Sequence, residues 1–519
     1  MHRSGHRVTP FAVAKGPPLS PPADWQVRYA AHAIICNRGW PLNFVGGIVF
    51  KTIHRTIQKI VFFAILFIVL APFGSPSVAQ NADNATPSAA EVWLADINAL
   101  DQFLRQYHPD PFFQTGEGHW RDGLRVARDL VTSGGSDVEI TTVLMSAIAG
   151  LRDGHTRLEP VGIDTFANWL PLRFYEFDDG VYVTVAAEQH ADLIGQRLIR
   201  VEESPVQDAL AMVALATAGD NALQVKEGAA ALLSNVGLLA ALGVIGEPTG
   251  SVTMAFEKSD GSLVTRTIPT INSSYSVNYR NWGELFGPPF DPFDVYKTPF
   301  RGGKAPLAYR DPPNTADAPF YASRKPFWAR LDRNETILTF QFNFFADIGD
   351  IGWDDFRSQM WAMLDRAQPE RFVIDLRYNF GGDGGMVRAF INELLARPQY
   401  ANGGRLVVLT GRQTFSAAVM LVAALMDHTD AVFVGEPPGA PLNQYGDPTS
   451  LTLPSGRLEL VVSTLYWQLG HPSNRTKIIP VNLCVHTRAA DYFTGTDVAW
   501  DLATREDISE IRTHQQSCE

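Results

Sequence analysis

The last third of the chain alternates short apolar runs with segments whose apolar residues recur at helical spacing. The helical segments cover about 354–367, about 384–396 and a stretch that begins at Ser416. Apolar strands separated by amphipathic helices predict an α/β core with a parallel-rich sheet, which we place at residues 331–505. The runs predicted to form its strands are "TILTFQF", "RFVIDLR", "RLVVLT", "AVFVGE" and "LELVVST".

The patterns upstream of this core predict several smaller parts. Helical spacing in "VWLADINALDQFLRQY" and "VEITTVLMSAIAGL" indicates a small helical domain. Short alternating runs such as "GVYVTVAA" indicate a β-rich module with a helical insert at about 206–243. The predicted parts are a presequence with signal peptide at 1–79, a polar linker at 80–90, the helical domain at 91–160, the β-rich module at 161–271, an aromatic and proline-rich arm at 272–330, and a tail at 506–519.

The segment "KTIHRTIQKIVFFAILFIVLAPFGSPSVAQ" has the features of a secretory signal peptide. A basic start precedes an apolar run from Ile60 to Pro72, and small residues stand at Ser77 and Ala79. We expect cleavage after Ala79 and a periplasmic or secreted protein. The run is short for a membrane span, so we expect no stable span after cleavage, whereas an uncleaved segment would anchor the protein in a membrane.

The residues before this segment do not fit a signal peptide. Residues 1–50 precede it, and no methionine lies between Met1 and Met145. We therefore expect translation to begin near Val49 on a non-AUG codon, with residues 1–48 a mis-assigned start.

The composition is globular and acidic. The chain has 45% hydrophobic and 19% charged residues, and 43 Lys and Arg stand against 55 Asp and Glu. This excludes disorder throughout and argues against nucleic acid or an anionic membrane as a partner. Cys36 lies in the presequence, and Cys484 and Cys518 are expected to form a disulfide in an oxidising compartment. Neither CxxC nor HExxH occurs, and we expect no metal and no cofactor.

A glycine-rich loop follows the predicted strand "RFVIDLR". Gly381, Gly382, Gly384 and Gly385 stand in "VIDLRYNFGGDGG". Glycine lets backbone N–H groups approach a ligand closely, so such a loop can present amides to an anion. No Lys-Ser/Thr pair follows, which excludes a phosphate-binding loop, and a plain tight turn would use the same glycines.

Ser416 stands where "RLVVLT" ends and the helical stretch "SAAVMLVAALM" begins. The helix dipole favours negative charge there, and the N–H of Ala417 has no intrahelical partner, so a nucleophilic serine would have an oxyanion donor beside it. Serine is also a preferred helix N-cap, which is a purely structural role. His155, in the turn "GLRDGHTRL" that ends the helical domain, is a candidate general base, although a surface imidazole is the ordinary interpretation of such a histidine.

These motifs resemble, in their order, those of the tail-specific or C-terminal processing serine proteases. That superfamily includes the tricorn protease core and interphotoreceptor retinoid-binding protein, and "DGHT" resembles the branch to which those two belong. The resemblance spans about 90–500. The other matching stretches are "VIDLRYNFGG", "VLTGRQTFSAA", "VGEPPGAPLNQYGD", "LELVVST" and "FTGTDVAWDLA".

The resemblance implies a ClpP/crotonase-like core that acts on peptide or protein substrates. Ser416 would be the nucleophile and His155 the general base, with the amides of Ala417 and of Gly381 or Gly382 as the oxyanion hole. The segment "GQRLIRVEESPVQDAL" resembles, only loosely, the PDZ-like module that often precedes such cores.

The chain departs from the resemblance at the groups that assist the serine. The processing-protease branch has a lysine about 25 residues after the serine, where this chain has Pro441, so we expect no Ser-Lys dyad; Lys477 is an outside candidate base. The stretch "HPSNRTKIIPVN", where the tricorn-like branch has its supporting glutamate, contains no acid. Glu436 or Asp447 are the candidates to orient the imidazole, and Asn474 is a weaker one.

Two functions from different classes are consistent with these residues. The first is a serine-type peptidase with an acyl-enzyme on Ser416 and His155 as base. The second is a non-catalytic protein that holds an apolar ligand on the same fold. Retention of serine, histidine and glycines favours the first, whereas the missing acid and lysine keep the second open. A third reading, hydrolysis of another acyl bond, shares the serine chemistry, and the oligomeric state is not predicted.

Overall fold

A computed structural model gives the structure of the protein and describes residues 87–247, 250–272, 300–302, 326–347, 352–505 and 518. The predicted presequence and signal peptide, most of the arm and most of the tail lie outside the described residues. The described residues all belong to the unit Ala85–Glu519. Within them, no helix combines the length and the apolar character that crossing a membrane requires.

Three helices lie in this part of the chain: α3 (Ala89–Tyr107), α4 (Gly118–Ser133) and α5 (Asp137–Ala149). α3 and α5 cover the two quoted stretches with helical spacing. α3 begins before the predicted end of the linker at residue 90, because Ser88 and Glu91 form a capping box that fixes its first turn. That pattern, a serine followed three residues later by a glutamate, was readable in the sequence.

The next part is an antiparallel sheet that carries a helical insert, as the alternating pattern predicts. Its strands follow the order β10-β4-β5-β7-β8, with β3 paired to β4 and β6 paired to β5. These strands are β3 (Leu172–Phe177), β4 (Gly180–Ala187), β5 (Arg197–Val201), β6 (Ser204–Pro205), β7 (Ser251–Glu257), β8 (Leu263–Pro269) and β10 (Phe300–Gly302); beside them β2 (Asn168–Trp169) pairs with β9 (Ile271–Asn272). The insert contains α6 (Val206–Ala214), α7 (Ala222–Leu232) and α8 (Val236–Ala241).

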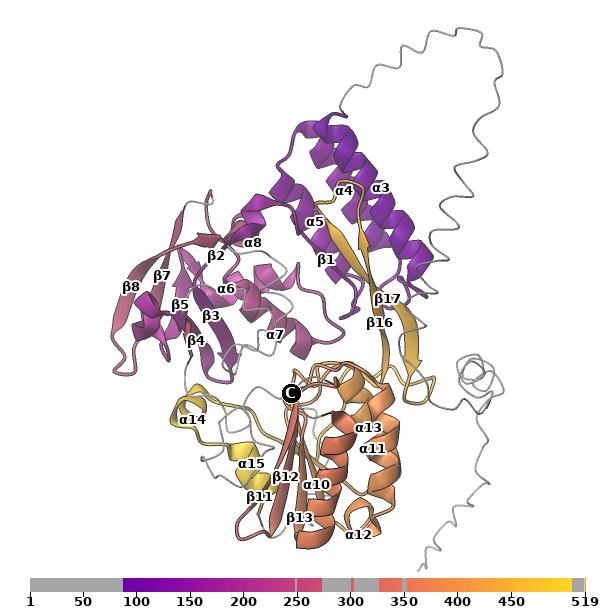
Figure 1. The fold of residues 1–519 in the computed structure, drawn as a ribbon. Coiled ribbons are helices and arrows are strands. Elements are labelled where there is room, and N and C mark those ends of the chain that lie inside the picture. The colour runs from indigo at the N-terminus through magenta and orange to yellow at the C-terminus, as the bar shows by residue number, and fades with distance from the viewer. Residues whose placement is uncertain are drawn as a thin grey trace, which may run out of the picture. The chain divides into compact units, whose positions relative to one another are not determined.

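The α/β core has a six-stranded sheet in the order β11-β12-β13-β14-β15-β18. Only β11 runs antiparallel to its neighbour, so the predicted mixed α/β class is confirmed (Figure 1). The strands are β11 (Phe327–Asp332), β12 (Ile337–Phe342), β13 (Arg371–Asp375), β14 (Leu406–Thr410), β15 (Val432–Gly435) and β18 (Leu483–Cys484), and the helices are α10 (Trp353–Ala367), α11 (Gly385–Leu395), α12 (Pro398–Ala401), α13 (Ala417–His428), α14 (Ala489–Thr494) and α15 (Val498–Ala503). α10, α11 and α13 pack on one face of this sheet, and α15 packs on the other.

The prediction that "LELVVST" is a strand of this sheet is wrong. All but the first of these residues lie in β17 (Glu459–Gln468), which forms a long hairpin with β16 (Asn443–Thr452) and pairs with β1 (Arg157–Glu159). The run is apolar because Leu458, Leu460 and Val462 are buried in the core of the helical domain. Figure 1 shows the yellow hairpin reaching from the core toward β1 and the indigo helices.

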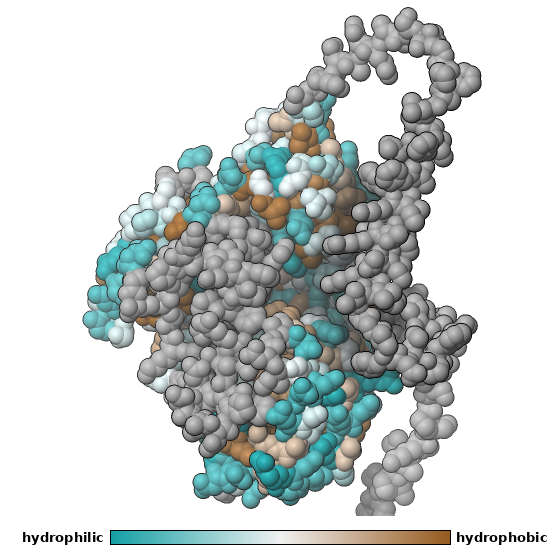
Figure 2. All heavy atoms as spheres, viewed as in Figure 1, coloured by the Kyte–Doolittle hydropathy of each residue, from teal (hydrophilic) through white to brown (hydrophobic). Residues whose placement is uncertain are grey.

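The surface of the described residues carries its large apolar side chains mostly as scattered single residues. Where Figure 2 draws residues in colour, hydrophilic and hydrophobic residues are interspersed. The most exposed of these side chains are Leu263 in β8, at 68%, and Leu215, the residue after α6, at 56%. Single exposed leucines of this kind are ordinary for a folded protein.

Candidate active site

Ser416 immediately precedes α13 but does not act as its cap. Its backbone has φ 54° and ψ −124°, and its side chain makes no capping hydrogen bond. A positive φ is unusual for a residue with a Cβ atom and is maintained only where the surroundings impose it. The structure therefore does not support the interpretation of Ser416 as a helix N-cap.

The turn before Ser416 is held by hydrogen bonds to the neighbouring strand end. The Thr414 hydroxyl accepts from the Gly411 N–H at 3.0 Å and donates to the Leu376 carbonyl at 2.8 Å. The Phe415 N–H donates to the Asn379 carbonyl at 2.9 Å. These bonds connect the end of β14 to the loop after β13, and together they fix the backbone at Ser416.

The glycine loop lies directly against the serine. A Cβ atom at Gly381 would stand 2.5 Å from the Ser416 Cβ and 3.0 Å from the Ala417 nitrogen, so only glycine allows this approach. Gly381 and Gly382 have φ of 110° and 122°, which also requires glycine. The loop that the sequence places at the same sheet edge as Ser416 is thus in contact with it.

The structure distinguishes between the two glycine amides. The Gly381 N–H donates to the buried Asn379 side chain at 2.9 Å and is therefore engaged. The Gly382 and Ala417 N–H groups have no hydrogen-bond acceptor within the part of the chain that the structure describes. The donors available to an oxyanion are those of Ala417 and Gly382. Asn379 was not among the residues predicted for the site, although it stands in the quoted motif "VIDLRYNFGGDGG".

His155 reaches the core through strand pairing. It lies just before β1, which pairs with β17, and its ring stacks on Phe415 with centroids 4.2 Å apart. Phe415 is the residue before Ser416, so the imidazole and the serine are brought into one neighbourhood. The imidazole is buried, at 6% exposure. The Tyr445 backbone lies close enough to raise the pKa of the ring, but neither ring nitrogen makes a hydrogen bond of acceptable geometry among the described residues. Burial lowers the pKa of His155 to about 4. The Asp153 charge opposes this shift, and the Arg157 charge adds a smaller lowering effect.

The two acids expected to orient His155 make other contacts. The Glu436 carboxylate accepts from His486 Nδ1 at 3.3 Å and lies near the Arg412 guanidinium. Burial would raise the pKa of Glu436, but the Arg412 charge and the His486 contact outweigh burial and lower this pKa. Asp447 is exposed. Neither is hydrogen-bonded to the imidazole in the described ranges.

Lys477, the outside candidate base, is hydrogen-bonded through Nζ to Gln114 Oε1 at 2.5 Å. Burial lowers the pKa of its ammonium, and the nearby Asp220 charge opposes that shift. Asn474 lies in an adjacent turn and uses its side-chain oxygen to accept from the Thr476 N–H. The structure therefore places Lys477 near carboxylates rather than in a hydrogen bond with Ser416.

Sequence reasoning missed two buried acids beside His155, Asp153 and Asp220. Asp153 stands in the quoted "DGHT" motif, and its carboxylate accepts from the His155 backbone N–H at 2.9 Å. Asp220 precedes Asn221, whose side chain caps α7, and nothing in that local pattern indicated a contact with His155. One side-chain oxygen of each acid and one ring nitrogen of His155 all lie within 4.8 Å of one another.

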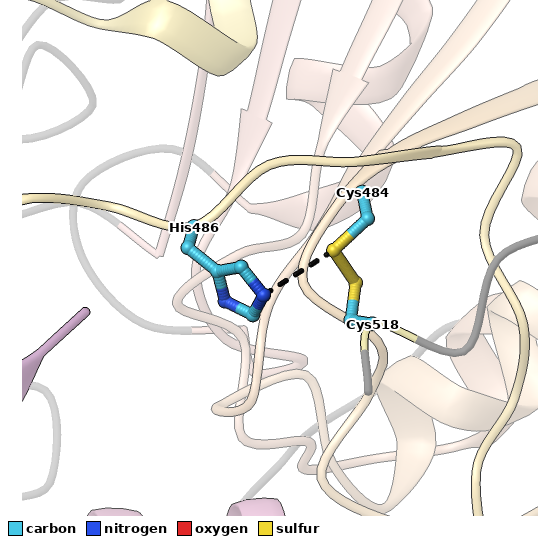
Figure 3. Close-up of side chains that lie close together, drawn as sticks. All are labelled: Cys484, His486 and Cys518. Carbon is cyan, nitrogen blue, oxygen red and sulfur yellow. Dashed lines mark hydrogen bonds between the residues drawn. A yellow bond between two sulfur atoms is a disulfide. The ribbon is translucent and has the colours of Figure 1, made fainter.

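Cys484 and Cys518 are joined by a disulfide in the structure (Figure 3). His486 Nε2 lies 3.5 Å from the Cys484 sulfur, and the hydrogen bond to Glu436 raises the pKa of His486. The bridge ties the penultimate residue of the chain to β18, at the end of the core sheet opposite β11.

A pocket of about 430 Å³ lies at the carboxyl end of β14 and β15. Its lining includes Thr410, Arg412 and Glu436, but neither Ser416 nor His155. Arg412 and Glu436 are paired with each other and with other groups there. The pocket is lined by Gly411, Arg412 and Gln413 of the turn that leads to Ser416, but not by Ser416 itself.

Neither a protein-family model nor a curated protein matches the chain. A serine-to-alanine mutant of CPAF matches with a TM-score of 0.58 and 13% identity, covering 82% of this chain and 99% of that one. Mature CPAF complexed with lactacystin matches with a TM-score of 0.54 and 12% identity over 82% and 98%. The tricorn protease matches with a TM-score of 0.37 and 13% identity over 82% and 37%, too weak a likeness to support a conclusion. The CPAF structures show a shared fold.

Proposed function

We propose that the chain is a serine-type peptidase that cleaves peptide or protein substrates through an acyl-enzyme. Ser416 is the nucleophile, His155 is the general base, and the N–H groups of Ala417 and Gly382 form the oxyanion hole. The observation that carries the proposal is the backbone of Ser416, which holds a positive φ at a helix start without capping the helix. Such strain is retained where a function uses it.

The proposed acylation step begins when the Ser416 Oγ attacks the substrate carbonyl carbon and His155 takes the hydroxyl proton. The carbonyl oxygen becomes an oxyanion that accepts from the Ala417 and Gly382 N–H groups. Collapse of this intermediate breaks the C–N bond, and His155 gives its proton to the leaving amine. Water then attacks the ester with the same proton transfers, which restores Ser416 and releases the acid product.

The resting position of His155 requires a closing movement. No hydrogen bond joins its ring to the Ser416 hydroxyl in the described structure, and both ring nitrogens are buried. Catalytic hydrogen bonds are often formed only when substrate binds, so we infer that the imidazole turns from its stacking position on Phe415 toward Ser416 in the complex.

We further infer that the core is of the ClpP/crotonase-like type, that the sheet before it is loosely PDZ-like, and that the protein is periplasmic or secreted. The signal-peptide pattern before Gln80 supports the location. A disulfide between Cys484 and Cys518 agrees with an oxidising compartment.

The enclosed imidazole favours one alternative, a non-catalytic protein that binds an apolar ligand. Labelling with a fluorophosphonate separates the two functions, because this reagent reacts with activated serines. We expect labelling of the wild type, no labelling of Ser416→Ala, and unchanged labelling of Ser136→Ala, a control at a serine that does cap its helix. A wild type that resists the reagent would favour the binding protein.

A further inference from the structure

Asp220 is anchored to the same turn that carries His155. It lies in the loop before α7, is 3% exposed, and accepts a hydrogen bond from the Gly154 backbone N–H. Its own N–H donates to Gln224 Oε1 at 2.8 Å. The second carboxylate oxygen, Oδ2, has no hydrogen-bond partner among the described residues. A buried carboxylate oxygen without a partner is costly, which indicates that it pairs with a group during function.

Asp153 is the other acid of this cluster, but both of its oxygens are occupied. Oδ1 accepts from the His155 backbone N–H at 2.9 Å. Oδ2 accepts from the Thr156 and Ser463 hydroxyls at 2.5 and 2.7 Å and lies 3.1 Å from His108 Nε2. This carboxylate fixes the turn against β17 and has little capacity left for the imidazole or for a cation.

The charges around the pair favour neutral forms at rest. Burial and the Asp153 charge raise the pKa of Asp220 well above its ordinary value, against the opposing effects of the Gly154 N–H and the Lys477 ammonium. His155 faces Asp153 and Arg157, and burial lowers its pKa. A proton gained by His155 would create a buried cation, and that cation would in turn lower the pKa of Asp220. Once Asp220 has released its own proton to solvent, its carboxylate is the available counter-charge.

We propose that Asp220 is the positioning carboxylate of His155, in place of the acid missing from "HPSNRTKIIPVN". The inference rests on the proposed peptidase function. An oxygen of Asp220 already lies within 4.8 Å of a ring nitrogen, and both atoms are buried. When the imidazole turns toward Ser416, Asp220 accepts from its other ring N–H, which fixes the tautomer that leaves one nitrogen free to take the serine proton.

Asp220→Asn is the sharpest variant, because the amide oxygen can still accept from the Gly154 N–H while the negative charge is lost. We expect kcat to fall by roughly 10²–10⁴ with KM within a few-fold of wild type, and the rate of Ser416 labelling to fall in parallel. Asp208→Asn, at an exposed position in α6, should match the wild type in both assays. The melting temperatures of all three proteins should agree within a few degrees.

The outcomes separate the inference from the function on which it rests. A labelled wild type with an equally reactive Asp220→Asn variant overturns the role of Asp220 and leaves the peptidase standing. A wild type that is neither labelled nor active overturns both. If the Asn variant does not fold, the structure of the wild-type phosphonyl adduct decides: an Asp220 oxygen within about 3.2 Å of a His155 nitrogen supports the inference, and a separation unchanged from the resting state refutes it.

Discussion

Replacing Ser416 by glycine should stabilise the protein while abolishing its activity. The observed φ of 54° and ψ of −124° cost a residue with a Cβ atom roughly 1–3 kcal/mol, and glycine is spared this cost. Glycine loses about 0.5–1 kcal/mol more conformational entropy on folding than alanine does. The net expectation is a core that is more stable by up to about 2 kcal/mol, with no capping hydrogen bond lost, because Ser416 makes none.

The matched control is Ser136→Ala, which removes a serine that accepts from the Glu139 N–H at 3.3 Å in a capping box. Its loss should lower stability by about 1 kcal/mol without affecting activity. Thermal melting followed by circular dichroism, and fluorophosphonate labelling of the same samples, should therefore move in opposite directions for the two variants. A Ser416→Gly protein that melts below the wild type would refute the reasoning, because the serine would then serve the fold.

Four further expectations follow from the structure. His155→Ala should reduce turnover by a factor on the order of 10³ or more while Lys477→Ala changes little, as measured by peptide hydrolysis; the reverse would assign the base to Lys477. The rising limb of the pH profile of kcat/KM should lie near pH 4 rather than in the ordinary histidine range, because burial lowers the pKa of His155 and the imidazole acts as a base only at a pH above its pKa. A limb near pH 6.5 would show that the imidazole is exposed in the free enzyme. Gly382→Ala should lower both activity and melting temperature, because the added Cβ would lie 2.2 Å from the Phe345 carbonyl oxygen; an unchanged melting temperature would contradict the structure. Cys484→Ser should lower the free energy of unfolding by roughly 3–4 kcal/mol, because the disulfide joins residues 34 apart in sequence. Two free thiols in exported wild-type protein would be the contrary result.

The sequence predicted the elements whose periodicity is local. β13 ends before the glycine loop and β14 ends before Ser416, as predicted. The helices that follow these two strands, α11 and α13, also lie at nearly the predicted positions. The shared edge of parallel strands then sufficed to bring Gly381 beside Ser416. These inferences succeeded because each depends on residues close in sequence or on one general rule of sheet topology.

The remaining features depend on contacts that no local pattern encodes. "LELVVST" is as apolar as a core strand, and only its pairing with β1, about 300 residues earlier, assigns it to another sheet. Asp220 lies in a loop where its neighbour caps a helix, and its proximity to His155 arises from packing between separate parts of the chain. The choice between the Gly381 and Gly382 amides required the hydrogen bond from Gly381 to Asn379.

The hairpin of β16 and β17 also determines when a growing chain can become active. His155 is held against the core by the pairing of β1 with β17, and Ser463 in β17 donates to Asp153 beside it. A chain made from its N-terminus cannot form these contacts until residue 463 has been added. If Ser416 and His155 act together as proposed, every shorter nascent chain lacks a positioned base. The proposed peptidase would thus be inactive while its chain is shorter than this.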